Sequence, residues 1–237
     1  MRTLVLRRLI SLIGVGTVFI GVAILAPVSL GQEVIPISPG NEPTWEKEMA
    51  KGFLPYHHLV TLDFPVKPDG PANIAFMLQP FIHCYYSIQG KSDANGFAYC
   101  YVANWKVFSG FDRNASWRNP RADMKALLPY AQALLDLAEI RARQFGALKE
   151  AELPSAKGAT FEEAQFHLQD ALGAFNHQHS WDMRKEVEKF VEDTKQGQDG
   201  RKVAQLAAEI RKRLQAIPPT NPHPATADAE HSDSGQK

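Results

Sequence analysis

The stretch SWRNPRADMKALLPYAQALLDLAEIRARQFG, residues 116–146, decides the fold, because it carries the strongest helical pattern in the 237-residue chain. Its apolar residues recur three and four positions apart, which places them on one stripe of an amphipathic helix that faces a core. Gly146 predicts the end of this helix. The expected stripe consists of Met124, Leu127, Leu128, Ala131, Leu134, Leu135, Ala138, Ala142 and Phe145.

The start and the middle of this helix carry further signals. Asn119 and Pro120 suit the N-cap and the first helical position. Pro129 lacks a backbone N–H, so it predicts a kink or a division into a short first turn and a longer second part. Glu139 and Arg143 are four residues apart, and we expect them to pair on the solvent-exposed side of the helix.

Residues 1–31 have the anatomy of a secretory signal peptide. A start with three arginines precedes an uncharged apolar run at residues 9–25, and small residues then predict cleavage before Gln32. An uncleaved membrane anchor is the alternative, because the run is close to the roughly 18 apolar residues that a spanning helix needs. With either a signal peptide or an anchor, we expect the rest of the chain to lie in the periplasm or the extracellular space. An uncleaved anchor would also attach it to a membrane.

The charge balance gives no reason to expect a nucleic-acid partner. The whole chain has 26 basic and 26 acidic residues, and losing Arg2, Arg7 and Arg8 with the signal segment leaves 23 against 26, a net charge of −3. Domains that bind nucleic acids usually carry a basic excess.

The sequence of the rest of the chain predicts one domain between two irregular segments. Residues 32–44 contain several prolines and predict an extended linker, and residues 218–237 lack any apolar period and predict a disordered tail. Residues 45–217 have the length of a single domain. It opens with a short polar helix at residues 45–51.

Two further helices follow the central one. Thr160 and Glu163 form a capping box, and an apolar stripe runs from there to Val191. Residues 196–200 predict a break, and residues 203–217 predict a last amphipathic helix.

Residues 76–88 and 96–108 are rich in aromatic and β-branched residues and predict two strands. A hairpin centred on Ser92 would place Cys84 opposite Cys100, Ile82 opposite Val102, Tyr85 opposite Tyr99 and His83 opposite Tyr101. Two opposed cysteines in an exported chain predict a disulfide. The alternative is a pair of reduced, half-buried thiols.

The histidines do not form a metal-binding pattern. His57 and His58 are adjacent, so in a strand they point to opposite faces, and we interpret both as polar residues near a strand start. His83 is interpreted as a hydrogen-bonded sheet residue, and the alternative is a metal ligand or a base beside Tyr101. His177 and His179 are two apart and cannot share an ion on one helix, and His179 is expected to be a packed, hydrogen-bonded residue on the apolar side.

Three short motifs resemble those of a family of secreted bacterial domains of unknown function that are regarded as zinc-dependent proteases. That family has a Leu-Thr-x-x-Asp-Phe opening, a Ser-Trp pair, a helix reading His-Glu-Gln-Gly-His-Phe-Asp-x-Ala-Glu, and a later Thr-x-His-Gly turn. Here the opening is similar to residues 58–64 with one residue out of step, and Ser116-Trp117 precedes the helix. The helical motif falls on residues 130–139 and the turn on residues 194–197, so the resemblance covers residues 56–214.

The residues that would perform the family's chemistry are replaced in this chain. Its two helical histidines are four apart and can hold one zinc ion, and the glutamate beside the first would be the general base. The positions of the ligands and the base carry Tyr130, Ala131, Leu134 and Gln196. The retained family positions would serve orientation, capping and packing; they are Ser116, Trp117, Gln132, Asp136, Glu139, Thr194 and Gly197.

These observations predict an exported α+β domain in which a small antiparallel sheet packs against two or three long helices. The resemblance implies a pseudoenzyme on a zinc-protease-like scaffold, with no catalytic residues, metal or cofactor, that binds a protein, a peptide or an envelope component. One alternative is a metal-dependent hydrolase with a relocated site, which would draw on His57, His58, His83, His177, His179, Asp63 and Asp136. A second alternative is a structural protein held at the membrane by its N-terminus.

Overall fold

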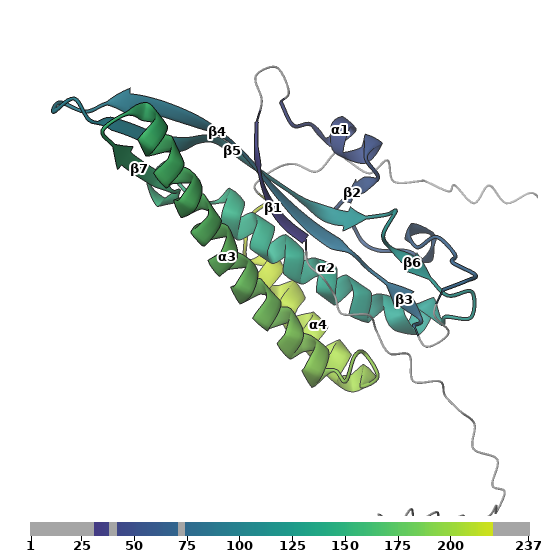
Figure 1. Cartoon of the computed structure of the whole chain (residues 1–237). Coiled ribbons are helices and arrows are strands. Elements are labelled where there is room, and N and C mark those ends of the chain that lie inside the picture. Colours follow the sequence, from purple (N-terminus) through teal and green to yellow (C-terminus); the bar gives the residue numbers. More distant parts are fainter. Residues whose placement is uncertain (1–30, 38–41, 71–73, 220–237) are drawn as a thin grey trace, which may run out of the picture.

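The computed structural model describes residues 31–37, 42–70 and 74–219. The α+β class is confirmed, because helices pack against a curled, mostly antiparallel sheet (Figure 1). The predicted signal segment and the predicted disordered tail lie outside the described residues, apart from Gly31, Pro218 and Pro219.

The main sheet is built around one long hairpin. Its strand order is β1-β4-β5-β2, and β7 pairs with the first residues of β5, 98–101, near the tip of the hairpin. The strands are β1 (Gly31–Pro36), β2 (Phe53–Pro55), β4 (Pro80–Ser92), β5 (Ala98–Asp112) and β7 (Ser155–Gly158). All pairings are antiparallel except that of β1 with β4, which is parallel. A second sheet holds only β3 (Phe76–Met77) and β6 (Trp117–Arg118).

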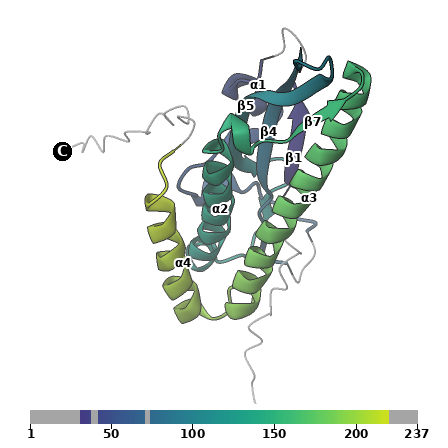
Figure 2. The same ribbon diagram turned by 90° about the vertical axis from the view of Figure 1, so that its left-hand side faces the viewer.

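Two long helices, α2 and α3, cover one face of the main sheet, and a third, α4, packs against α2. Figure 2 shows α2 between α3 and α4, and Figure 1 shows α3 running from the tip of the hairpin to the opposite end of the molecule. The helices are α1 (Trp45–Ala50), α2 (Met124–Gly146), α3 (Phe161–Asp193) and α4 (Gly200–Gln215), with 3-10 turns η1 (Thr61–Asp63) and η2 (Glu150–Glu152). The predicted short opening helix and the break before the last helix are confirmed.

The start of α2 differs from the prediction. The N-cap is Asp123, whose side chain accepts a hydrogen bond from the backbone N–H of Ala126 at 3.3 Å. Asn119 instead accepts from the N–H of Arg121 in the preceding turn, at 3.0 Å. Pro129 does not divide the helix, because it lies in the first two turns and removes only one helical hydrogen bond. The predicted end at Gly146 is confirmed.

The predicted solvent-exposed pair on α2 is buried. Arg143 Nε lies 2.8 Å from Glu139 Oε1, so the pair forms, but the side chain of Glu139 is only 2% exposed. The reason is that α2 is covered on more than one side, by β5 and by α4. Residues 130–140 are therefore buried around the whole helix and not only along the predicted stripe.

The predicted linker begins as a strand. Residues 31–36 form β1 and pair with residues 81–86 of β4. The proline at position 36 suggested an irregular segment, but a strand at the sheet edge tolerates it because its outer N–H groups need no partner.

The hairpin is confirmed, but its predicted register is wrong. Asp93 N donates to Phe97 O at 2.8 Å, so the turn is centred three residues beyond Ser92. The observed pairs are Ile82 with Ser109, His83 with Phe108, Cys84 with Val107, Tyr85 with Lys106, and Cys100 with Gly90.

The predicted disulfide is consequently wrong as well, because Cys84 and Cys100 are both free. Cys84 lies in the middle of β4, whereas Cys100 lies near the hairpin tip, opposite Gly90. Burial raises the pKa of the Cys84 thiol. Both residues are buried and belong to separate hydrophobic clusters, which makes them packing residues.

Candidate functional site

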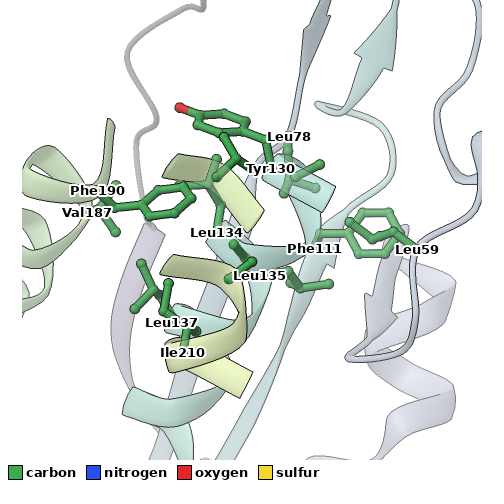
Figure 3. Close-up of a cluster of buried hydrophobic side chains, with 14 of the residues drawn as sticks. Leu59, Leu78, Phe111, Tyr130, Leu134, Leu135, Leu137, Val187, Phe190 and Ile210 are labelled. Carbon is green, nitrogen blue, oxygen red and sulfur yellow. The ribbon is translucent and has the colours of Figure 1, made fainter. Parts of the chain in front are cut away.

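Three of the four positions that correspond to the protease family's ligands and base lie in the main hydrophobic core, and the fourth, Gln196, is half-buried in the turn after α3. Tyr130, Ala131 and Leu134 are at most 1% exposed and belong to the cluster drawn in Figure 3. The ring of Tyr130 stacks on Phe190 of α3, with centroids 5.3 Å apart and planes 25° apart. Apolar packing therefore fills the place where the resemblance puts a metal ion.

The turn after α3 comes directly against the same tyrosine. A Cβ atom added at Gly197 would lie 3.0 Å from Cγ of Tyr130. The fold therefore brings residues 130 and 197 together although 67 positions separate them in the chain. This contact puts the two motif segments, 130–139 and 194–197, side by side.

Backbone geometry and one threonine hold this turn. Lys195, Gln196 and Gly197 have φ values of 50°, 58° and 81°, a left-handed run that is costly for the two non-glycine residues. Thr194 is fully buried, and its hydroxyl donates to Phe190 O at 2.7 Å and accepts from Gly197 N at 3.3 Å. Gln196 N donates to Val191 O at 2.7 Å. Thr194 and Gly197 thus have structural roles as a cap and a left-handed position.

Two retained polar residues of α2 fasten the loop that follows β2. Gln132 Oε1 accepts from the backbone N–H of Leu59 at 2.7 Å, and its Nε2 donates to Asp136 Oδ1 at 2.8 Å. The hydroxyl of Tyr56 also donates to Asp136 Oδ1, at 2.8 Å. Burial, together with the charge and hydrogen bond of Asp136, raises the pKa of Tyr56. A buried, fully bonded network of this kind fixes one arrangement of the chain.

The next acidic residue of α2 connects the sheet to the last helix. Glu139 accepts hydrogen bonds from Ser109 of β5 and from Arg143 one turn later. Arg143 Nη1 then donates to the carbonyls of Leu214 and Ile217, at 3.2 and 2.7 Å. Arg143 therefore caps the C-terminal end of α4 while its charge balances that of Glu139.

Ser116 and Trp117 organise the approach to α2. The hydroxyl of Ser116 donates to Asp112 O at 2.6 Å and accepts from Gln79 N at 3.1 Å. Trp117 pairs with Met77 in the small sheet, and the ammonium group of Lys67 lies 5.2 Å from its ring centroid. Every retained family position therefore makes a structural contact.

The candidate histidines are dispersed. His57 lies 2.8 Å from Pro55 O through Nδ1 and 3.1 Å from Asp63 Oδ2 through Nε2, and the hydrogen bond to Asp63 raises its pKa. His58 and His177 are exposed. As expected, His179 packs among apolar residues, with its ring centroid 4.8 Å from that of Phe145 and 4.3 Å from that of Phe175, but its buried Nδ1 has no hydrogen-bond partner among the described residues.

Among residues 31–37, 42–70 and 74–219, no group of three or more His, Cys, Asp or Glu side chains gathers closely enough to hold a metal ion. Asp63 and Asp136, which the relocated-site alternative would use, are engaged by His57 and by Tyr56 with Gln132.

A buried polar cluster that the sequence did not reveal joins α1 to β4. Glu48 is 1% exposed; its carboxylate lies 2.7 Å from His83 Nδ1 and accepts from Tyr85 Oη at 2.7 Å and from Lys51 Nζ at 2.8 Å. Burial alone would raise the pKa of Glu48, but these hydrogen bonds outweigh it and lower the pKa to about 2. The prediction of His83 as a hydrogen-bonded sheet residue is confirmed, whereas its partner on α1 carried no local signal in the sequence.

None of the helices in the described part of the chain combines the length and apolarity needed to cross a membrane. No protein-family model, no curated protein and no solved structure matches the chain.

Proposed function

We propose that this chain is an exported, non-catalytic domain that acts by binding a protein, a peptide or an envelope component. The observation that carries the proposal is the packing of Tyr130, Ala131 and Leu134 in the core. A hydrolytic zinc site needs deprotonated or neutral polar ligands around an open coordination position. Here the corresponding space holds aromatic and aliphatic side chains from α2 and α3.

The polar residues that surround this core favour the same reading. Gln132 and Asp136 use their side-chain atoms to join the loop after β2 to α2, and Glu139 joins β5 to α2 and pairs with Arg143. Each carboxylate is thereby committed to hydrogen bonds within the protein. A scaffold of this kind supplies a rigid surface for binding, and neither of these two described carboxylates stands as a general base beside an open metal position.

The test measures zinc and hydrolysis on one sample, the chain from Gln32 to Lys237. After expression with zinc available and gentle desalting, we expect zinc far below one ion per chain and no chelator-sensitive cleavage of a broad peptide library. Near-stoichiometric zinc together with cleavage that a chelator abolishes would overturn the proposal.

Tyr130→Phe is the matched control for the core. The hydroxyl of Tyr130 is buried and has no hydrogen-bond partner among the described residues. Removing it should therefore retain the fold and leave the zinc content and the peptide cleavage unchanged. Loss of a detected activity in Tyr130→Phe would instead give this hydroxyl a catalytic role.

A further inference from the structure

The outer edge of β4 is paired along only part of its length. Residues 81–86 pair with β1 on the outer side, while β5 lies on the inner side throughout the hairpin. Within the described ranges, no strand pairs with the outer side of residues 87–92. Figure 1 shows this part of the hairpin extending beyond the end of β1.

Two hydrogen bonds establish which backbone groups point outward along this edge. Tyr86 O accepts from Ile37 N at 2.6 Å on the outer side, whereas Asp93 N donates inward to Phe97 O at 2.8 Å. Backbone groups alternate between the two sides of a strand. Ile88, Gly90 and Ser92 therefore direct their N–H and C=O groups away from β5.

The two faces beside this edge differ in chemistry. On the face covered by α3, the ring of Phe161 lies over Gly90, since a Cβ added there would be 2.9 Å from the ring, and Phe161 is 49% exposed. On the other face, the ammonium group of Lys91 lies 5.2 and 5.3 Å from the ring centroids of Tyr99 and Tyr101. The edge is thus bordered by an exposed apolar ring on one side and by a cation on the other.

We propose that the edge from Ile88 to Ser92 binds an extended peptide as an added strand, with apolar side chains toward Phe161 and acidic side chains toward Lys91. This inference rests on the proposed function and gives it a surface and a partner class. Main-chain hydrogen bonds supply affinity in strand addition, and alternate side chains supply specificity. A second copy of the chain fits less well, because pairing through the same edge would bring another Lys91 to the same face.

The direct test is a titration of a fluorescently labelled heptapeptide that alternates valine and glutamate with the full purified chain. Ser92→Pro removes one outward N–H group without removing a bond to β5, because an edge position tolerates proline. We expect this variant to weaken binding by about fivefold to tenfold, the effect of one lost hydrogen bond. Ser92→Ala is the matched control and should bind as the unaltered chain does.

Charge reversal gives an independent readout that does not depend on proline. Lys91→Glu should weaken binding of the valine–glutamate peptide and strengthen binding of a valine–lysine peptide. Phe161→Ala should weaken both peptides equally, because it removes apolar contact without changing charge. Far-UV circular dichroism of each variant checks that the fold is retained. If Ser92→Pro does not fold, the effect of Lys91→Glu alone tests whether the peptide binds at this edge.

Several outcomes would overturn this inference. Equal binding by the unaltered chain, Ser92→Pro and Lys91→Glu would place the peptide elsewhere and leave the proposed binding function in place. No binding of either peptide would show that Gly90 and Lys91 merely protect the edge from pairing. A dimer in sedimentation that Ser92→Pro dissociates would assign the edge to a second copy. The zinc and hydrolysis measurements test the proposed function independently of these peptide-binding and sedimentation results.

Discussion

His83 Nδ1 lies 2.7 Å from Glu48 Oε2, and this contact fastens the short helix α1 to the middle of β4. A six-residue helix is too short to be stable alone, so its position depends on such contacts. Trp45 adds an edge-to-face contact with Phe108, at 4.9 Å between centroids. The polar and aromatic contacts together hold α1 on the sheet face opposite the long helices.

The first prediction concerns the pH dependence of this cluster. The pKa of Glu48 is about 2 in the folded chain against an ordinary value of 4.5, so its stabilisation is complete above pH 4.5 and is lost as the pH falls toward 2. Glu48→Gln should lower the free energy of unfolding by about 2 to 3 kcal/mol at pH 7 and by much less near pH 2. Urea unfolding of both chains at several pH values measures the difference. A difference independent of pH would contradict the assignment of the charge.

The second prediction concerns the contact between Gly197 and Tyr130. Gly197→Ala should lower stability by about 1 to 3 kcal/mol, because φ is +81° and the new Cβ would meet the ring at 3.0 Å. Gly173→Ala is the matched control, since nothing lies within 4 Å of a Cβ at that helical position. It should raise stability by about 0.5 to 1 kcal/mol. Thermal unfolding compares the two, and equal effects would refute the specific role of Gly197.

The third prediction concerns the two cysteines. Because both are free and buried, an alkylating reagent should modify both after unfolding without any reductant, and both only slowly in the folded chain. Mass spectrometry counts the added groups. A chain that resists alkylation until it is reduced would show a disulfide and would contradict the observed register.

The fourth prediction concerns Pro129. It is exposed within the first two turns of α2 and leaves the carbonyl of Lys125 without its helical donor. Pro129→Ala restores that donor, so we expect the free energy of unfolding to rise by about 1 kcal/mol or more. Guanidinium unfolding provides the measurement. A fall in stability would mean that the stiffness that proline gives the unfolded chain outweighs the missing bond.

The helical part of the fold could be predicted because its signals are local. Gly146 ends α2, and Thr160 caps α3 by accepting from Glu163 N at 3.2 Å, as the sequence indicates. The Glu163 side chain bonds Ala159 N, one residue before the expected partner. The prediction of Asn119 as the N-cap of α2 was wrong, because an Asn-Pro pair also suits the turn that precedes the helix.

The register of the hairpin could have been obtained from its turn. Asp93 Oδ1 accepts from the N–H groups of Asn95 and Phe97, and Gly96 has a φ of +83°. An aspartate followed three residues later by glycine is typical of a three-residue hairpin loop. The predicted hairpin centred on Ser92 does not fit this turn. The predicted pairing of Cys84 with Cys100 depended on that centre and is wrong for the same reason.

The polar clusters were beyond local sequence patterns. Glu48 and His83 are 35 positions apart, and Tyr56 and Asp136 are 80 apart. No periodicity connects residues at such separations, so only the packed fold brings them together. The same holds for Tyr130 and Gly197, which lie 67 positions apart and meet only in the folded chain.

The pairing of β1 with β4 affects when the N-terminal segment can be cleaved relative to folding. Gly31 pairs with Phe81 and Gln32 with Ile82, so the bond at which we expect the signal segment to be cut belongs to the sheet. The side chain of Gln32 is also tied to Asn176 of α3, at 2.8 Å. A peptidase needs its substrate bond accessible and detached from other strands. If the chain is cut at this bond, as the sequence predicts, then processing has to precede the docking of β1, and maturation and folding follow a fixed sequence.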